Sequence, residues 1–498
     1  MPDADSGADR PNVVVFLCDQ LRRQALSCAG DPNVETPTVD GLAAEGARFE
    51  NSCSTYPICV PARFSFVTGE HPHTRFVPGI DWRMSPAERT VADEFGDAGY
   101  TTAYVGKWHL SGHHSFRLGE DDLEPGERQV RLNRQAVPPE CQGRFDHWRG
   151  FELRNDPFDT AYFVDDDPEP RLLDGYQTDG LTDLAVDFVE DHADDDEPFF
   201  LVVSVEPPHP PFVAPEAYQE RWADRDLELR PNVPFGDPDR VPGSHDRWGP
   251  RDGVTEDYWE AAGYFSDAVS DEMRSYYAMI ENVDDNVGRL LDALDREGVG
   301  VGADTAFAFL SDHGEMLGSH GHMAKQRPHE ESVGVPFVVA GGGVEAGQVR
   351  PEPTCTEDWL PTLLGLAGLE PRDEKPGRNL APLLRGETGD LDREGVLLEF
   401  VREARPGMPF AEETWRGFRT ERYKYTVKGG MRGGEPWQLF DLREDPYEQE
   451  NLVDDDAHED VAHELHGRLR DALDRYDDPY GLRAAFGHDS LNVRPEPN

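Results

Sequence analysis

The sequence is short of basic residues, and it has no long apolar run. Lys and Arg total 48 against 100 Asp and Glu, which gives a formal net charge of −52. We exclude nucleic acid as a partner, because so acidic a chain offers no basic stripe for a phosphate backbone. No apolar stretch approaches the roughly 18 residues that cross a bilayer, so we expect no membrane segment.

Cysteines are also few, and their positions show no paired spacing. The six are at positions 18, 28, 53, 59, 141 and 355, with no C-x-x-C among them. We therefore expect neither a disulfide framework nor a zinc site. The first ten residues lack the order of a signal peptide, in which a basic segment precedes an apolar one. We expect a cytoplasmic protein.

Acidic residues are spread along the whole chain, although 37% of the residues are hydrophobic and 10% are aromatic. That apolar content argues against an intrinsically disordered acidic chain. So large a charge would repel itself in dilute salt and destabilise a compact fold. We interpret the composition as the surface of a halophile's protein, in which salt screens the repulsion. An ordinary acidic protein is the alternative.

Apolar, β-branched runs predict strands that are buried on both faces of a sheet. The main runs are residues 13–18, 101–105, 198–205, 306–310 and 335–340, with a short strand at 47–51. Helices are predicted at residues 36–46, 90–98, 176–192, 273–296 and 358–368. This alternation predicts an α/β domain. Segments 110–175 and 213–270 show no periodicity, and we expect irregular insertions there that select the substrate.

Residues 370–390 are rich in Pro, Gly and charge, which predicts a domain boundary. We divide the chain into residues 1–378 and a small α+β domain of residues 379–498. The small domain is predicted to contain antiparallel strands at 396–401, 416–427 and 437–442, with a helix at 461–476 against them.

Polar residues follow the carboxyl ends of the predicted strands, where open α/β sheets bind their ligands. An Asp in such a place is often a helix cap, and a lone Lys or His there is usually only solvated. Several strand ends carry such residues at once, which favours a shared site. They are Asp19, Gln20, Lys107, His109, His209, Asp312 and His313, with Lys325 in a later loop.

The stretch Tyr56–Arg63 contains the pattern C-x-P-x-R, formed by Cys59, Pro61 and Arg63. A helix is predicted to begin at Arg63. A nucleophile near a helix N-terminus lies among free N–H groups and the positive end of the helix dipole, which favour an anion. The simpler interpretation of a lone Cys is a small buried hydrophobe.

Four motifs together resemble the type I sulfatases, a branch of the alkaline-phosphatase superfamily. They are Asp19-Gln20, the C-x-P-x-R at Cys59, Gly106-Lys107-Trp108-His109 and Ser311-Asp312-His313-Gly314-Glu315. The resemblance runs from about residue 11 to residue 452, in the family's order. It implies a mostly parallel mixed sheet between helices, plus a small C-terminal antiparallel sheet with one helix. It also implies that residues 1–378 are a catalytic domain that hydrolyses small-molecule or carbohydrate sulfate monoesters.

In that family a maturation enzyme oxidises the motif cysteine to formylglycine, and the hydrate of this aldehyde is the nucleophile. The matching positions imply one divalent metal, with calcium as the first choice and manganese or magnesium as alternatives. The implied ligands are Asp19, Gln20, Cys59, Asp312 and His313. Many members have a second Asp where Gln20 stands, so this site carries one negative charge less.

The remaining matches imply roles in binding and proton transfer. Arg63, Lys107 and Lys325 match positions that hold the sulfate or the hydrate. His209 matches the proton donor to the leaving oxygen, and we expect it to titrate near the ordinary pKa of about 6.5. His109 matches the base that deprotonates the second hydroxyl and so expels sulfate.

Two positions depart from the family pattern. Glu70 follows Thr68-Gly69 where an Arg is usual, in a region that the maturation enzyme recognises, and Gly334 stands where an Arg is common. Two other functions remain open. One is a phosphonate monoester or phosphodiester hydrolase of the same superfamily, and the other is a non-catalytic binding protein with unmodified Cys59.

Overall fold

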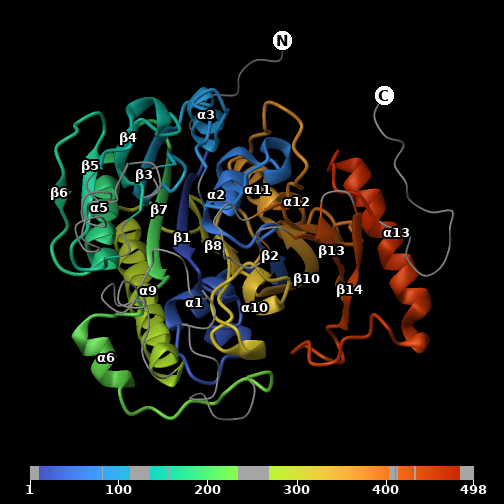
Figure 1. Ribbon diagram of the computed structural model, residues 1–498. Helices are drawn as coiled ribbons and strands as arrows, with labels where there is room; N and C mark the ends of the chain where they lie inside the picture. The colour runs from blue at the N-terminus through green and yellow to red at the C-terminus, as the bar shows by residue number, and fades with distance from the viewer. Residues whose placement is uncertain are drawn as a thin grey trace, which may run out of the picture.

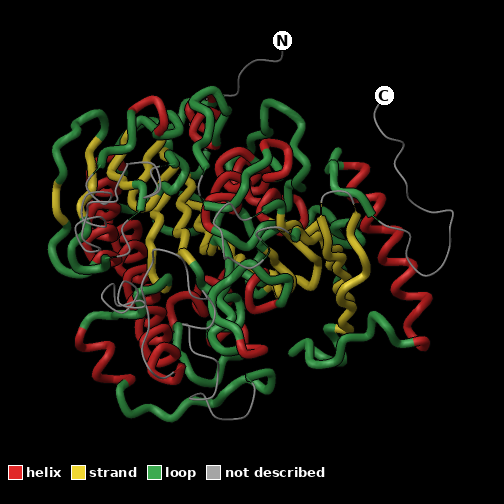
Figure 2. The backbone as a smooth tube through the Cα atoms, viewed as in Figure 1, coloured by secondary structure: helices red, strands yellow, loops and turns green. Residues whose placement is uncertain are grey.

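The structure is a computed structural model that describes residues 10–80, 82–112, 135–153, 156–233, 269–402, 410, 413–430 and 433–482. A large sheet lies between two layers of helices, and a second, smaller sheet lies at the C-terminal side with one long helix against it (Figures 1 and 2). No helix in this described part is long and apolar enough to cross a membrane.

The large sheet has ten strands in the order β10-β2-β9-β8-β1-β7-β3-β4-β5-β6. Its centre is parallel, because β1 (Asn12–Asp19) pairs in parallel with both β7 (Phe199–Pro208) and β8 (Thr305–Ser311), and β7 pairs in parallel with β3 (Thr101–Lys107). Antiparallel pairs occur where β9 (Phe337–Ala340) joins β8 and β2 (Ala47–Cys53). The predicted mostly parallel mixed sheet is confirmed.

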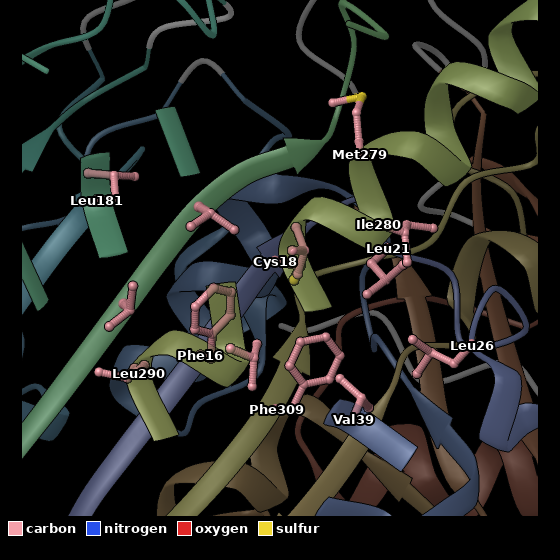
Figure 3. Packing of buried hydrophobic residues seen from close by; sticks show 14 of the residues in the cluster. Phe16, Cys18, Leu21, Leu26, Val39, Leu181, Met279, Ile280, Leu290 and Phe309 are labelled. Atoms are coloured by element: carbon pink, nitrogen blue, oxygen red, sulfur yellow. The ribbon is translucent and has the colours of Figure 1, made fainter. Parts of the chain in front are cut away.

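Strand β1 explains why the centre of the sheet is buried on both faces. All eight of its residues are buried. Phe16 and Cys18 point to one face and pack near Phe309 and Ile280, as Figure 3 shows. Val13, Val15 and Leu17 belong to the cluster on the opposite face. A continuous apolar run, rather than an alternating one, is what a doubly covered strand requires.

Each face of the sheet has its own layer of helices (Figure 1). The first layer consists of α1 (Pro37–Glu45), α5 (Gln177–His192) and α9 (Val269–Arg296). The second contains α2 (Cys59–Thr68), α3 (Val91–Asp97) and α11 (Trp359–Leu366). The helices predicted from the sequence are therefore present, with ends that shift by a few residues.

The expectation that residues 110–175 are irregular is wrong for part of the segment. Strands β4 (His147–Phe151), β5 (Ala161–Val164) and β6 (Arg171–Leu172) extend one side of the large sheet. They are too short for a clear alternating pattern. Residues 113–134 and 154–155 of this expected insertion lie outside the described residues.

Further elements were also missed, among them one helix and one strand. A short helix, α6 (Glu216–Trp222), lies within the segment 213–270, of which residues 234–268 lie outside the described residues. Strand β10 (Gln348–Cys355) contains Pro351 and Pro353, which argue against a strand in sequence. It lies at one end of the strand order, where proline is tolerated because one side needs no partner.

The small sheet has the antiparallel order β11 (Val396–Phe400), β12 (Thr414–Arg419), β13 (Tyr423–Gly430) and β14 (Gly433–Asp441). Helix α13 (Glu459–Arg475) packs on it, as predicted. The single strand expected at 416–427 is instead a hairpin, whose turn at 420–422 contains neither Gly nor Pro. The domain boundary after residue 378 remains a proposal, and α12 (Ala381–Leu384), just beyond it, packs with the large sheet.

A buried histidine joins the small sheet to the segment that follows α2. His73 donates from its backbone N–H to Glu399 Oε1 at 3.0 Å, and its Nδ1 lies 2.5 Å from Glu399 Oε2. Burial lowers the pKa of His73, but the adjacent Glu399 carboxylate outweighs it and raises the pKa to about 9. The imidazole is therefore charged at neutral pH and holds the small sheet to the segment that follows α2.

We predict that folding requires molar salt. The charge of −52 includes exposed acidic runs such as Asp194–Glu197 in the turn before β7. The distance over which salt screens the repulsion between such charges shortens to about 3 Å at 1 M salt. The melting temperature should therefore rise from dilute buffer to molar potassium chloride. A non-ionic osmolyte at equal osmolality is the control. A melting temperature that is equal or lower in high salt would contradict the prediction.

Candidate active site

The carboxyl ends of the four central strands converge on the first turn of α2. Four side chains from three of these elements place their ligand atoms within 4.8 Å of one another, and all four residues are buried. They are Asp19, Cys59, Asp312 and His313. The structure thus brings together residues that are up to 294 positions apart because parallel strands end at one edge of the sheet.

Cys59 is the first residue of α2, so this helix begins four residues before the expected Arg63. Its sulfur lies 3.1 Å from His313 Nε2, 3.5 Å from Lys325 Nζ and 3.6 Å from Asp19 Oδ1. Burial, helped by the charge of Asp19, raises the pKa of the Cys59 thiol to about 11. An unmodified thiol here is neutral at physiological pH and a poor nucleophile.

Arg63 lies one turn further along α2 and forms hydrogen bonds to residues of four strands or their ends. Its guanidinium donates to Asp312 Oδ2 at 2.9 Å and to Asp19 Oδ2 at 3.4 Å. It also donates to the Lys107 carbonyl at 2.9 Å and to Ser204 Oγ at 2.8 Å. One buried side chain therefore contacts β7 and the residues at or just past the ends of β1, β3 and β8. Its role toward a sulfate group stays a prediction.

The two carboxylates face the same space, and their pKa values are pushed apart. Burial, followed by the negative charge of Asp19, raises the pKa of Asp312 to about 6. Burial also acts to raise the pKa of Asp19, but Lys107 and other nearby positive charges lower it well below its usual value. Lys107 Nζ lies 2.6 Å from Asp19 Oδ2 and 3.5 Å from Glu206 Oε1.

The donor set fits a hard divalent cation. His313 Nδ1 lies 3.1 Å from the Gly314 carbonyl, which can only accept, so Nδ1 carries the proton. The lone pair of Nε2 then faces Cys59 Sγ at 3.1 Å, Asp19 Oδ1 at 3.5 Å and Asp312 Oδ1 at 3.6 Å. Two carboxylates suit such an ion, and the imidazole, oriented by its other nitrogen, would add one nitrogen ligand to the oxygens.

Gln20 lies beside these ligands with a left-handed backbone, φ 71°. Its N–H donates to Asp312 Oδ1 at 3.1 Å. Its side-chain amide lies between Glu315, to which Nε2 donates, and Lys325, which donates to Oε1. Gln20 as a metal ligand therefore stays a prediction.

The two remaining histidines lie just past strand ends. His109 is buried two residues beyond β3, with φ 61°. His209 follows β7, and its Nδ1 lies 2.6 Å from the Pro210 carbonyl. The expectation that His209 titrates near its ordinary pKa is wrong. Burial, and then the charge of Lys325, lower its pKa well below that value.

Three residues of the site were not singled out from the sequence. Ser204 and Glu206 lie in β7 and contact Arg63 and Lys107 respectively. Glu315 lies on the loop after β8 and contacts Gln20. Glu206 could have been found by its place at a strand end, and Glu315 by its place in the Asp312-His313-Gly314-Glu315 motif. Ser204, within an apolar strand, gave no signal.

Comparison with known proteins shows where this arrangement belongs. The sequence profile of the family described as Sulfatase matches residues 11–369. The chain belongs to the sulfatase family. A second profile, for the C-terminal part of N-sulphoglucosamine sulphohydrolase, matches residues 318–475 of this sulfatase.

Individual relatives support the same family and fold. An ulvan-active sulfatase of Formosa agariphila is 32% identical over 95% of this chain and 83% of its own length. The crystal structure of YidJ from Bacteroides fragilis covers 96% of this chain and 99% of its own at TM-score 0.76 and 26% identity. The phosphonate monoester hydrolase of Agrobacterium radiobacter shares the fold, at TM-score 0.68 and 24% identity, over 98% of this chain and 100% of its own.

We predict that the site binds calcium and that Arg63→Lys weakens this binding about 10–100-fold, the usual effect of losing a group that orients metal ligands. A lysine keeps the charge, but it cannot bridge both carboxylates as the guanidinium fork does. Isothermal titration of chelator-treated protein with calcium measures the effect. The control is Arg416→Lys, which removes an equally buried fork to Asp478 in the small sheet. Unchanged calcium affinity in Arg63→Lys would contradict the prediction.

Proposed function

We propose that this sulfatase hydrolyses sulfate monoesters of a small molecule or carbohydrate. The nucleophile would be Cys59 oxidised to formylglycine, and one divalent metal ion, with calcium as the first choice, would assist it. The position of Cys59 carries the proposal. Its side chain lies in the first turn of α2, among two carboxylates, an imidazole and a lysine. The family to which the chain belongs supports the reaction.

The metal would be held by Asp19, Asp312 and His313, together with Gln20 and the modified Cys59. A bound divalent ion lowers the pKa of a hydroxyl group beside it and withdraws charge from sulfuryl oxygens. The chain's own contribution is to hold two carboxylates close together in a buried space, which Arg63 and Lys107 make possible.

The remaining side chains would handle the sulfate group and the protons. In our proposal one hydroxyl of the Cys59 hydrate, ionised with its proton released to solvent, would attack sulfur, and the S–O bond to the alcohol would break. Lys107 and Lys325 would hold the sulfuryl oxygens, and His209 would give a proton to the departing oxygen. His109 would then take the proton of the second hydroxyl, so that sulfate leaves and the aldehyde is restored.

His209 is neutral in the free protein because its pKa is lowered, and its Nδ1 proton is engaged with Pro210. The proton that it donates must therefore be acquired at Nε2. The arrival of a negatively charged ester beside the imidazole favours that protonation.

The organic part of the substrate is proposed from a relative. The Formosa agariphila relative is named as active on ulvan, and on that ground we propose a sulfated carbohydrate. A maturation enzyme that oxidises Cys59 is the proposed macromolecular partner. Glu70, where the family usually has Arg, would lie in the segment that this partner reads.

We predict that Cys59→Ala abolishes hydrolysis of an aryl sulfate while the melting temperature changes little. The reason is that no other group in the proposal can supply the attacking oxygen. The control is Cys53→Ala, which removes another buried thiol from β2 and should retain activity. Retention of most activity in Cys59→Ala would refute the proposed nucleophile.

Sulfate monoesters are predicted to be better substrates than phosphate monoesters, with phosphonate monoesters, which carry a single charge like sulfate, as side substrates. A phosphate monoester brings nearly two negative charges at neutral pH where a sulfate monoester brings one, and the two carboxylates of the proposed site, Asp19 and Asp312, would repel the second charge. The measurement compares kcat/KM for matched aryl esters, using protein whose Cys59 is shown to be converted. A phosphonate rate tenfold or more above the sulfate rate, about 1.4 kcal/mol, would move the assignment to the phosphonate hydrolases.

A further inference from the structure

Glu315 lies three residues beyond Asp312 and is 1% exposed. Both of its oxygens are used as acceptors. Oε2 accepts from the side-chain amide of Gln20, and Oε1 accepts from the backbone N–H groups of Leu317, at 2.9 Å, and Ala324. All three partners are donors, so the carboxylate needs no proton to satisfy them.

This contact decides which way the Gln20 amide faces. In the present orientation Nε2 donates to Glu315, and Oε1 accepts from Lys325. The flipped amide would put its oxygen against the Glu315 carboxylate and its NH2 group against the Lys325 ammonium. Both contacts would then be unfavourable, because acceptor would meet acceptor and donor would meet donor.

The same carboxylate closes the loop that presents Lys325. Leu317 and Ala324, whose N–H groups meet at Glu315 Oε1, both have left-handed backbones, with φ 45° and φ 57°. Lys325 follows Ala324 directly, and its Nζ reaches Cys59 Sγ at 3.5 Å. Residues other than glycine keep such φ angles only where surrounding contacts hold the backbone in place.

We propose that Glu315 is a positioning residue. It turns the oxygen of Gln20 toward Lys325 and the metal site, and it fixes the loop so that Lys325 reaches Cys59. Within the described part of the chain its hydrogen bonds go to Gln20 and to the loop before Lys325, and not to Cys59, Asp19 or Asp312. It therefore acts through Gln20 and Lys325. The proposal rests on the proposed roles of these two residues in sulfate hydrolysis.

The test variant is Glu315→Gln, which keeps the shape of the side chain and one acceptor oxygen for the loop. Its new NH2 group would face the NH2 group of Gln20, so the Gln20 amide would flip. Its oxygen would then turn away from Lys325 and the metal site. Calcium titration of the chelator-treated full chain should show affinity about 10–100-fold weaker than in the wild type.

A second readout does not depend on metal. Acetylation of lysines by a water-soluble ester, followed by mass spectrometry, should show faster labelling of Lys325 in Glu315→Gln. Lys375, which pairs with Glu70 at 3.0 Å, is the internal reference. If the wild type binds no calcium but Lys325 is labelled faster in the variant, the metal part of the proposed function fails and the positioning role stands.

Two further variants separate positioning from general stability. Glu94→Gln is the matched control, because Glu94 is also buried, pairs with Arg89 at 2.7 Å and accepts from the Arg372 N–H at 3.0 Å. It should leave calcium affinity and Lys325 labelling unchanged. Combining Gln20→Glu with Glu315→Gln exchanges donor and acceptor, so the pair should re-form and restore the wild-type labelling rate.

We expect weaker calcium binding and faster labelling of Lys325 in Glu315→Gln, and no change of either quantity in Glu94→Gln. The exchanged pair should show the wild-type labelling rate. Unchanged calcium affinity and unchanged labelling in Glu315→Gln would overturn the proposal. Faster labelling of Lys325 that persists in the exchanged pair would also overturn it. If neither Glu315 variant folds while Glu94→Gln does, Glu315 serves the fold itself and the proposal is also overturned.

Discussion

The site depends on two carboxylates that are buried in one place. Asp19 and Asp312 lie at the ends of neighbouring parallel strands, where both would be costly to ionise without positive charge nearby. Arg63 contacts both of them, and Lys107 contacts Asp19. Because Arg63 also contacts Ser204 and the Lys107 carbonyl, a single guanidinium fixes α2 relative to four strands. The position of Cys59 on that helix follows from the same contacts.

The chemistry of Cys59 is consistent with this arrangement. A helix N-terminus would favour a thiolate, but burial and the Asp19 carboxylate act against it and raise the pKa of the thiol to about 11. The surroundings therefore suit a divalent cation and an oxygen nucleophile better than a free thiolate. This contrast is the physical reason for preferring a modified Cys59 to a cysteine that acts as it stands.

Much of the fold was predictable because parallel strands buried on both faces have continuous apolar sequences, as in β1, β7 and β8. The residues after those runs were predictable as site candidates for the same reason, since parallel strands end together. Short strands such as β5, and the Pro-containing edge strand β10, lack such a signal. The hairpin at residues 420–422 was missed because its turn has neither Gly nor Pro.

Contacts within the site were less predictable than its membership. The lowered pKa of His209 depends on burial and on Lys325, which is 116 positions away in sequence. The Glu315–Gln20–Lys325 contacts depend on a loop whose backbone is left-handed at Leu317 and Ala324. Neither local pattern nor residue type specifies such an arrangement, because it exists only once the strands have been brought together.

The central claim is that Cys59 is oxidised to an aldehyde before the protein acts. Mass spectrometry of the peptide that contains Cys59, from protein purified from its native host, tests this most directly. The account predicts a peptide in which the thiol is replaced by an aldehyde, and which reacts with a hydrazide reagent. An intact Cys59 thiol throughout a preparation that hydrolyses sulfate esters at full rate would contradict it.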